Sequence, residues 1–260
     1  MDVNYSIIQW TLWAGVASAL ATGIGALPVH FLRRDSNVLQ SFSIAFAAGM
    51  MLSASAFSLV QEGINLQSRY PLAPYSVIGG LLLGATFFWL TEKFLHEESH
   101  YLKKARDQMG VQGIMIFLAM FIHSIPEGIA IGVGFATGDL GFGIMMALAI
   151  GVHNIPEGMA ISLPLHNKGV STKKCAGISI VSSLPQPLLA VPSALAVHIF
   201  DPLLPVGLGF AAGAMIYLVI SEMLPDAMEK GGKVITAWGC MIGLSFMLTF
   251  TVLISNMFGQ

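Results

Sequence analysis

Long runs of apolar residues follow one another along almost the whole chain. Eight of these runs are each about 20 residues or longer, the length that an α-helix needs to cross the hydrocarbon core of a bilayer. Because a chain inside a bilayer must satisfy its backbone hydrogen bonds within each segment, we expect all eight runs to be helices. They cover residues 7–32, 38–60, 72–95, 111–136, 142–165, 175–199, 204–224 and 235–257.

The composition agrees with an all-α membrane protein. Of the 260 residues, 55% are hydrophobic and 10% are charged, whereas a soluble domain carries about 25% charged residues. Eight spans leave little of the chain for anything else, so we expect residues 1–260 to form a single transmembrane domain in a lipid bilayer. The formal net charge of −2 gives no reason to expect nucleic acid as a partner.

The basic residues indicate the orientation of the chain. If the N-terminus lies on the non-cytoplasmic side, eleven of the twelve Lys and Arg residues fall in cytoplasmic connections or, for Lys93, at the adjoining end of a span, and only Arg69 does not. Cytoplasmic loops of membrane proteins are enriched in Lys and Arg. The sequence therefore predicts a multi-pass protein with an even number of spans and both termini on the non-cytoplasmic side. In a prokaryote the membrane would be the cell (inner) membrane.

Two segments of the chain resemble each other. "FAAGMMLSASAFSLVQEG" begins at Phe46, and "FAAGAMIYLVISEMLPDA" begins at Phe210. In the expected orientation these two spans, the second and the seventh, cross the membrane in opposite directions. This indicates an inverted repeat of the kind found in secondary transporters. The alternative is a chance likeness between two helix faces rich in small residues.

A histidine and a glutamate occur together twice inside apolar spans. "FIHSIPEGIA" contains His123 and Glu127, and "GVHNIPEGMA" contains His153 and Glu157. Residues four apart share one face of a helix. The two spans join through "TGDLG" around Asp139, and both pairs lie about 20–25 Å from this turn at a rise of about 1.5 Å per residue. The four side chains are therefore predicted to meet near mid-membrane.

The cost of burying these groups favours a functional site. An unpaired charged carboxylate at the centre of a bilayer costs about 2.5–3.5 kcal/mol, and the cores of these two spans contain no Lys or Arg. Imidazole nitrogens and carboxylate oxygens suit zinc and neighbouring transition ions. Two alternatives remain open. The glutamates could be protonated and packed in a helix bundle without a metal, or the protein could be a proton-coupled carrier of a small organic solute.

No span contains the H-E-x-x-H motif of zinc proteases, so we do not expect an enzyme.

Prolines mark places where the helices lose backbone hydrogen bonds. Pro126 and Pro156 deprive the carbonyls of Ile122 and Val152 of their helical donors, and a kink is expected beside the four candidate ligands. The sixth span is expected to be irregular, because prolines stand at positions 185, 187 and 192.

The chain resembles the ZIP (Zrt-/Irt-like) metal transporters. The likeness rests on "HSIPEG" and "HNIPEG" in spans four and five, and on "GIGALPV", "AAGMML", "SSLPQPLLAVP" and "AAGAMIYLVISEMLPDA" in spans one, two, six and seven. It implies eight helices, with spans 1–3 and 6–8 as inverted repeats around a hairpin of spans 4 and 5. It also implies transport of divalent metal toward the cytoplasm, frequent homodimers and no catalytic cofactor. Zinc is the favoured ion, with iron, manganese, cobalt and cadmium as alternatives.

The same resemblance implies a metal centre with two adjoining positions. The first position would use His123, Glu127, His153 and Glu157. The second would share both glutamates and add Ser124, Asn154 and Gln186. Ser124 stands where the family usually has Asn, and Gln186 stands where it has Glu. Gln186 keeps an amide oxygen as a ligand atom but lacks the charge, so we expect one principal ion and a weakly or transiently occupied second position.

Three further carboxylates are candidates for an ion relay. Glu62 near the outer end of span two would act at the entrance, and Glu222 and Asp226 near the inner end of span seven would act at the exit. The alternative for each is a helix-end carboxylate in water.

Overall fold

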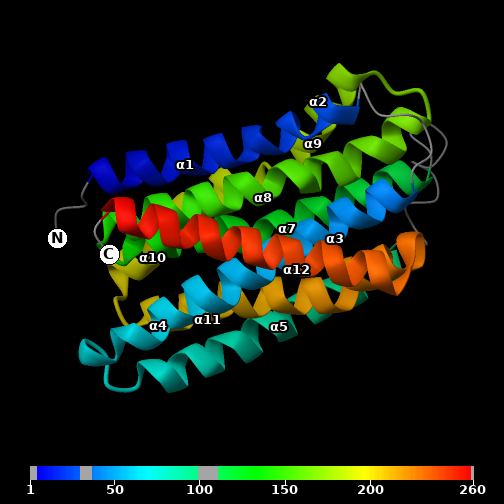
Figure 1. Cartoon of the computed structure of the whole chain (residues 1–260). Helices are drawn as coiled ribbons and strands as arrows, with labels where there is room; N and C mark the ends of the chain where they lie inside the picture. The colour runs from blue at the N-terminus through cyan, green and yellow to red at the C-terminus, as the bar shows by residue number, and fades with distance from the viewer. Residues whose placement is uncertain (1–4, 30–36, 99–110, 259–260) are drawn as a thin grey trace.

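A computed structural model describes residues 5–29, 37–98 and 111–258, and all regular structure in these residues is helical. The helices run alongside one another in a bundle (Figure 1). Their bounds are α1 Tyr5–Ile24, α2 Ala26–Val29, α3 Asn37–Ser53, α4 Gln61–Asn65, α5 Ala73–Glu98, α7 Val111–Ala136, α8 Leu140–Asn167, α9 Thr172–Ser182, α10 Pro185–Ile199, α11 Leu203–Leu218 and α12 Leu224–Phe258. Two π-helical segments, Ala54–Val60 and Val219–Met223, continue α3 and α11, and the 3₁₀ turn Leu66–Ser68 follows α4.

Six helical stretches of the described residues are long and apolar enough to cross a membrane, which agrees with an integral multi-pass protein. The last of them contains 55 residues, far more than the roughly 20 that one crossing needs. Gly232 interrupts it, with a non-helical φ of 79° and ψ of 170°. A shorter apolar helix covers Met120–Ala136 within α7. The six stretches are Ser6–Val29, Asn37–Ser68, Ala73–Thr91, Leu140–Asn167, Thr172–Ile199 and Leu203–Met257.

The expected spans coincide closely with these helices. The predicted fourth span has the same limits as α7, and the fifth lies within α8. The end of the first predicted span, beyond Val29, lies outside the described residues. The sixth span is divided between α9 and α10, which are separated by residues 183–184. The irregularity that the prolines predict is therefore confirmed.

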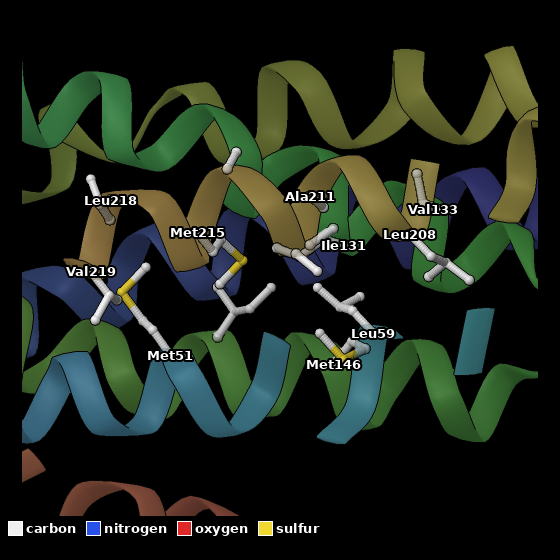
Figure 2. Close-up of a cluster of buried hydrophobic side chains, with 14 of the residues drawn as sticks. Met51, Leu59, Ile131, Val133, Met146, Leu208, Ala211, Met215, Leu218 and Val219 are labelled. Carbon is white, nitrogen blue, oxygen red and sulfur yellow. The ribbon is translucent and has the colours of Figure 1, made fainter. Parts of the chain in front are cut away.

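The helices pack in two groups. In the first group α3 lies along α12, and α5 lies along α11. In the second group α7 lies along α10, and α1 contacts α8, α9 and α10. An apolar core joins the two groups, where side chains of α3, α7, α8 and α11 interdigitate (Figure 2). The candidate ligands on α7 and α8 therefore lie beside this contact between the groups.

Features of the second span recur in the seventh at corresponding positions. When Phe46 is aligned with Phe210, residues 55–59 of one π-helical segment correspond to the other segment, Val219–Met223. The close helix contacts correspond as well. A Cβ atom at Gly84 would lie 2.0 Å from the carbonyl oxygen of Phe210, and one at Gly243 would lie 2.0 Å from that of Phe46. The backbone carbonyl of each repeated phenylalanine thus faces a glycine on a neighbouring helix.

Replacing Gly84 by Ala is expected to destabilise the protein by about 1–3 kcal/mol, because the added methyl group overpacks a contact made with backbone. Gly79, on the same helix, has nothing within 4 Å of an added Cβ, so Gly79→Ala should be neutral or slightly stabilising, since Ala favours helix over Gly. Thermal unfolding of the purified proteins in detergent compares the two. Equal melting temperatures for both variants would show that the α5–α11 contact tolerates a methyl group.

Candidate metal centre

The hairpin of α7 and α8 brings the two His-Glu motifs together. Asp139 caps the start of α8, where its side chain accepts a hydrogen bond from the backbone N–H of Phe142. From this turn the two helices run antiparallel. The Nε2 atom of His153 lies 3.1 Å from Oε1 of Glu127, so side chains from the two motifs reach the same depth, as their spacing predicts.

Three of the four predicted ligands form a compact, buried group. Single ligand atoms of Glu127, His153 and Glu157 all lie within 4.8 Å of one another. The three residues are between 0% and 4% exposed. One imidazole and two carboxylates at this separation form a ligand set that can bind a divalent cation. The cation would also balance two negative charges that are expensive to bury.

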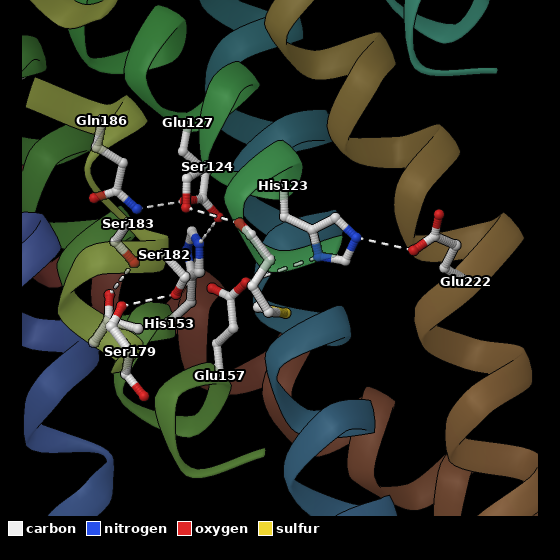
Figure 3. A network of polar contacts seen from close by, with 12 residues as sticks. His123, Ser124, Glu127, His153, Glu157, Ser179, Ser182, Ser183, Gln186 and Glu222 are labelled. Atoms are coloured by element: carbon white, nitrogen blue, oxygen red, sulfur yellow. Dashed lines mark hydrogen bonds and ion pairs between the residues drawn. The ribbon is translucent and has the colours of Figure 1, made fainter. Parts of the chain in front are cut away.

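His123 lies at the edge of this group and makes its closest ionic contact elsewhere (Figure 3). Its Nδ1 atom is 4.0 Å from Oε1 of Glu157, whereas its Nε2 atom is 2.9 Å from Oε2 of Glu222. Its ring also packs against Phe88, with a centroid distance of 5.8 Å. Glu222 lies in the π-helical segment after α11, and Phe88 belongs to α5. His123 therefore connects the metal-ligand cluster to the group of helices that contains α5 and α11.

Several buried polar atoms of this region have no hydrogen-bond partner among the described residues. They are His123 Nδ1, His153 Nδ1, Asn154 Oδ1 and Glu157 Oε1. Buried polar groups in native proteins are almost always satisfied by protein or by a bound species. Four such atoms in adjoining residues therefore indicate a site built for a ligand.

Gln186 is turned the other way from the sequence-based expectation. Its amide nitrogen, not its oxygen, faces the carboxylates and donates a hydrogen bond to Oε2 of Glu127 at 2.5 Å. Its Oε1 atom accepts a hydrogen bond of 3.2 Å from Nδ2 of Asn154. The amide oxygen is therefore engaged with another side chain. In this arrangement the oxygen that Gln186 would offer to a second ion is directed away from Glu127.

Ser124 is buried next to the group, and its hydroxyl is engaged within its own helix. It donates its proton to the carbonyl oxygen of Met120, one turn earlier. Pro126 and Pro156 both lie inside their helices, α7 and α8, and the kink expected at each stays a prediction.

The three relay candidates do not form one cluster. Glu222 joins the centre through His123. Asp226 forms an ion pair with Lys230, one turn further along α12. Glu62 is half-buried on α4, close enough to Asp139 for their charges to interact. The structure thus joins Glu222 to the centre, whereas Asp226 is paired with Lys230.

Sequence reasoning overlooked Ser18 in the first span. Its hydroxyl and its carbonyl oxygen each accept a 3.0 Å hydrogen bond from Nδ2 of Asn154. One turn further, Thr22 shares a 2.8 Å hydrogen bond with Ser183. The only sequence signal was the presence of two small polar residues four apart in an apolar run.

Comparison with known proteins identifies the family. A protein-family model described as "ZIP Zinc transporter" matches residues 97–251. The chain belongs to the ZIP zinc transporter family. It is therefore a membrane transporter of metal ions and not an enzyme, as the motifs predicted.

Curated relatives align over nearly the whole chain. A protein of Arabidopsis thaliana that is named as a candidate zinc transporter is 40% identical over 246 residues, covering 93% of this chain but only 38% of the longer plant protein. Zinc transporter GufA of Myxococcus xanthus is 33% identical over 244 residues, covering 91% of this chain and 96% of the relative. Zinc transporter ZIPB of Bordetella bronchiseptica is 34% identical over 266 residues, covering 95% of this chain and 81% of the relative.

Proposed function

We propose that this ZIP protein carries a divalent transition metal ion, with zinc as the favoured cargo, across its membrane toward the cytoplasm. The observation that carries the proposal is the buried group of Glu127, His153 and Glu157, whose ligand atoms lie within 4.8 Å of one another. One divalent ion there would balance both carboxylates. Iron, manganese, cobalt and cadmium are alternative cargoes, because nitrogen and oxygen ligands accept all of these ions.

Zinc is favoured for two reasons. The relatives from Myxococcus xanthus and Bordetella bronchiseptica are both named as zinc transporters. In addition, imidazole and carboxylate ligands in a four-coordinate arrangement are typical of zinc sites that keep one position open. His123, at 4.0 Å from Glu157, could complete such a site after a small movement of its side chain.

We propose a single transporter domain, residues 1–260, with eight spans and both termini on the non-cytoplasmic side. Dividing Leu203–Met257 at Gly232 and adding the apolar helix Met120–Ala136 to the other stretches gives eight segments. The start of α1 and the end of α12 lie at the same end of the bundle (Figure 1). The paired π-helical segments and glycine contacts support an inverted repeat of spans 1–3 and 6–8. In a prokaryote the membrane would be the inner membrane.

We further propose that Glu222 takes part in releasing the ion. Its 2.9 Å contact with His123 joins a candidate ligand to the opposite group of helices, and Glu222 is less buried than the central carboxylates, with a side-chain exposure of 31%. An ion leaving Glu157 would meet His123 and then Glu222. Asp226 would act later and only after separating from Lys230, and Glu62 would act at the entrance.

Uptake of several metals into proteoliposomes, with and without a pH gradient, tests the function. Zinc uptake by the wild-type protein that is lost in Glu127→Gln would support it, since the amide retains the shape of the carboxylate but not its charge. Uptake of an organic solute with no binding of any divalent ion would favour the alternative, a proton-coupled carrier. Cross-linking in the membrane at low protein density would test the expected homodimer.

Metal affinity should fall as the solution is made more acidic than about pH 7. The sign follows from competition, because His binds a metal only when neutral and protons displace metal from carboxylates. Titration of the purified protein with zinc at several pH values measures the effect. An affinity that stays constant or rises on acidification would argue against His and Glu as ligands.

A further inference from the structure

The side chain of Asn154 is held in one orientation by span one. Its Nδ2 atom lies 3.0 Å from the carbonyl oxygen of Ser18, 3.0 Å from the hydroxyl oxygen of Ser18 and 3.2 Å from Oε1 of Gln186. Its two N–H groups serve these three acceptors, so one N–H is shared. All three residues are buried, with exposures of 0% for Asn154, 2% for Ser18 and 0% for Gln186. A carbonyl oxygen only accepts hydrogen bonds. Rotating the amide by 180° would place its oxygen against that carbonyl and is therefore unfavourable.

This orientation determines that of Gln186. Because Oε1 of Gln186 accepts from Asn154, its Nε2 atom must point away from Asn154, and it donates to Oε2 of Glu127 at 2.5 Å. The other carboxylate oxygen of Glu127 contacts His153. A continuous series of hydrogen bonds thus connects the backbone of span one with one oxygen of a central carboxylate.

We propose that Gln186, held by Asn154 and through it by Ser18, is a positioning residue of Glu127 and not a ligand of a second ion. This proposal rests on the proposed function. The amide nitrogen of Gln186 takes the place beside Glu127 that a second cation would otherwise occupy, and it leaves Oε1 of Glu127 for the transported ion. Partners that orient a metal ligand in this way typically change metal affinity by about 10–100-fold when they are removed.

Zinc affinities of the full-length protein in detergent, measured by competition with a chromophoric chelator, test the proposal. Gln186→Ala and Asn154→Ala should each weaken binding of the central ion by about tenfold or more. The double variant should bind no more weakly than Gln186→Ala, because Asn154 acts through Gln186. Ser18→Ala should cause a smaller loss of a fewfold, since the Ser18 carbonyl remains, and this loss should vanish in the Asn154→Ala background.

Ser162→Ala is the matched control. Ser162 is a fully buried serine of α8 whose hydroxyl bonds that of Ser179 at 3.2 Å, outside this series. Its replacement should leave the affinity unchanged. Losses in Asn154→Ala and Gln186→Ala that multiply in the double variant, or an unchanged central affinity with loss of a second bound ion, would overturn the proposal. Two other results would contradict the proposed function itself. The wild-type protein would bind no zinc, or His153→Ala would bind zinc normally.

Discussion

Replacing His153 by Ala should lower zinc affinity by more than about 100-fold, because loss of an outer partner alone costs about 10–100-fold and His153 belongs to the central group. It is the only nitrogen donor among the three residues whose ligand atoms lie within 4.8 Å of one another. Its removal leaves Glu127 and Glu157 as the only members of that group. Zinc uptake into proteoliposomes should be lost together with binding.

The control for His153→Ala is a histidine of the same helix whose side chain lies away from the centre. His166, near the end of α8, bonds the carbonyl of Val170 through Nδ1 at 3.1 Å. His166→Ala should therefore bind and transport zinc as the wild-type protein does. A purified His153→Ala protein with normal affinity and normal uptake would reject the central site.

His123→Ala should behave differently from His153→Ala. His123 lies 4.0 Å from Glu157 but 2.9 Å from Glu222, so it contributes less to the resting group and more to the passage of the ion between the two groups of helices. We expect a modest loss of affinity and a sharp loss of uptake. Equal losses of affinity in the two variants would show that both histidines bind the ion directly.

The second large effect is expected from Gln186→Glu. The wild-type protein should hold one tightly bound divalent ion per protomer, since two ions would bring four positive charges against the shared −2 of Glu127 and Glu157. A carboxylate in place of the Gln186 amide would face Oε2 of Glu127, which the amide nitrogen contacts at 2.5 Å. Two buried carboxylates at that distance require a proton or a cation between them, so the substitution should raise occupancy of the second position.

Counting bound metal in the purified proteins, or anomalous diffraction from crystals, decides the outcome. Turnover in Gln186→Glu should slow, because a more attractive site releases its ion less readily. Two fully occupied central sites in the wild-type protein would show that neutral side chains suffice for the second ion. The charge argument would then be wrong.

Much of the fold follows from local features of the sequence. The limits of α7 agree with the apolar run 111–136, and the division of the sixth span follows from prolines that cannot donate hydrogen bonds. The meeting of Glu127 with His153 needed only the spacing within each helix and the turn at Asp139. These features depend on neighbours in the chain, which the sequence states directly. The π-helical segments at Ala54–Val60 and Val219–Met223 carry no comparable local signal.

The orientation of the side chains in the centre was decided only by the tertiary structure. Gln186 presents its nitrogen to Glu127 because Asn154 occupies its oxygen, and Asn154 is held in turn by Ser18, 136 positions earlier in the chain. His123 faces Glu222, 99 positions later. An amide or an imidazole takes the direction that its hydrogen-bond partners impose. Those partners come from helices far apart in the sequence, so the residue types predicted a metal centre while packing determined which atoms face it.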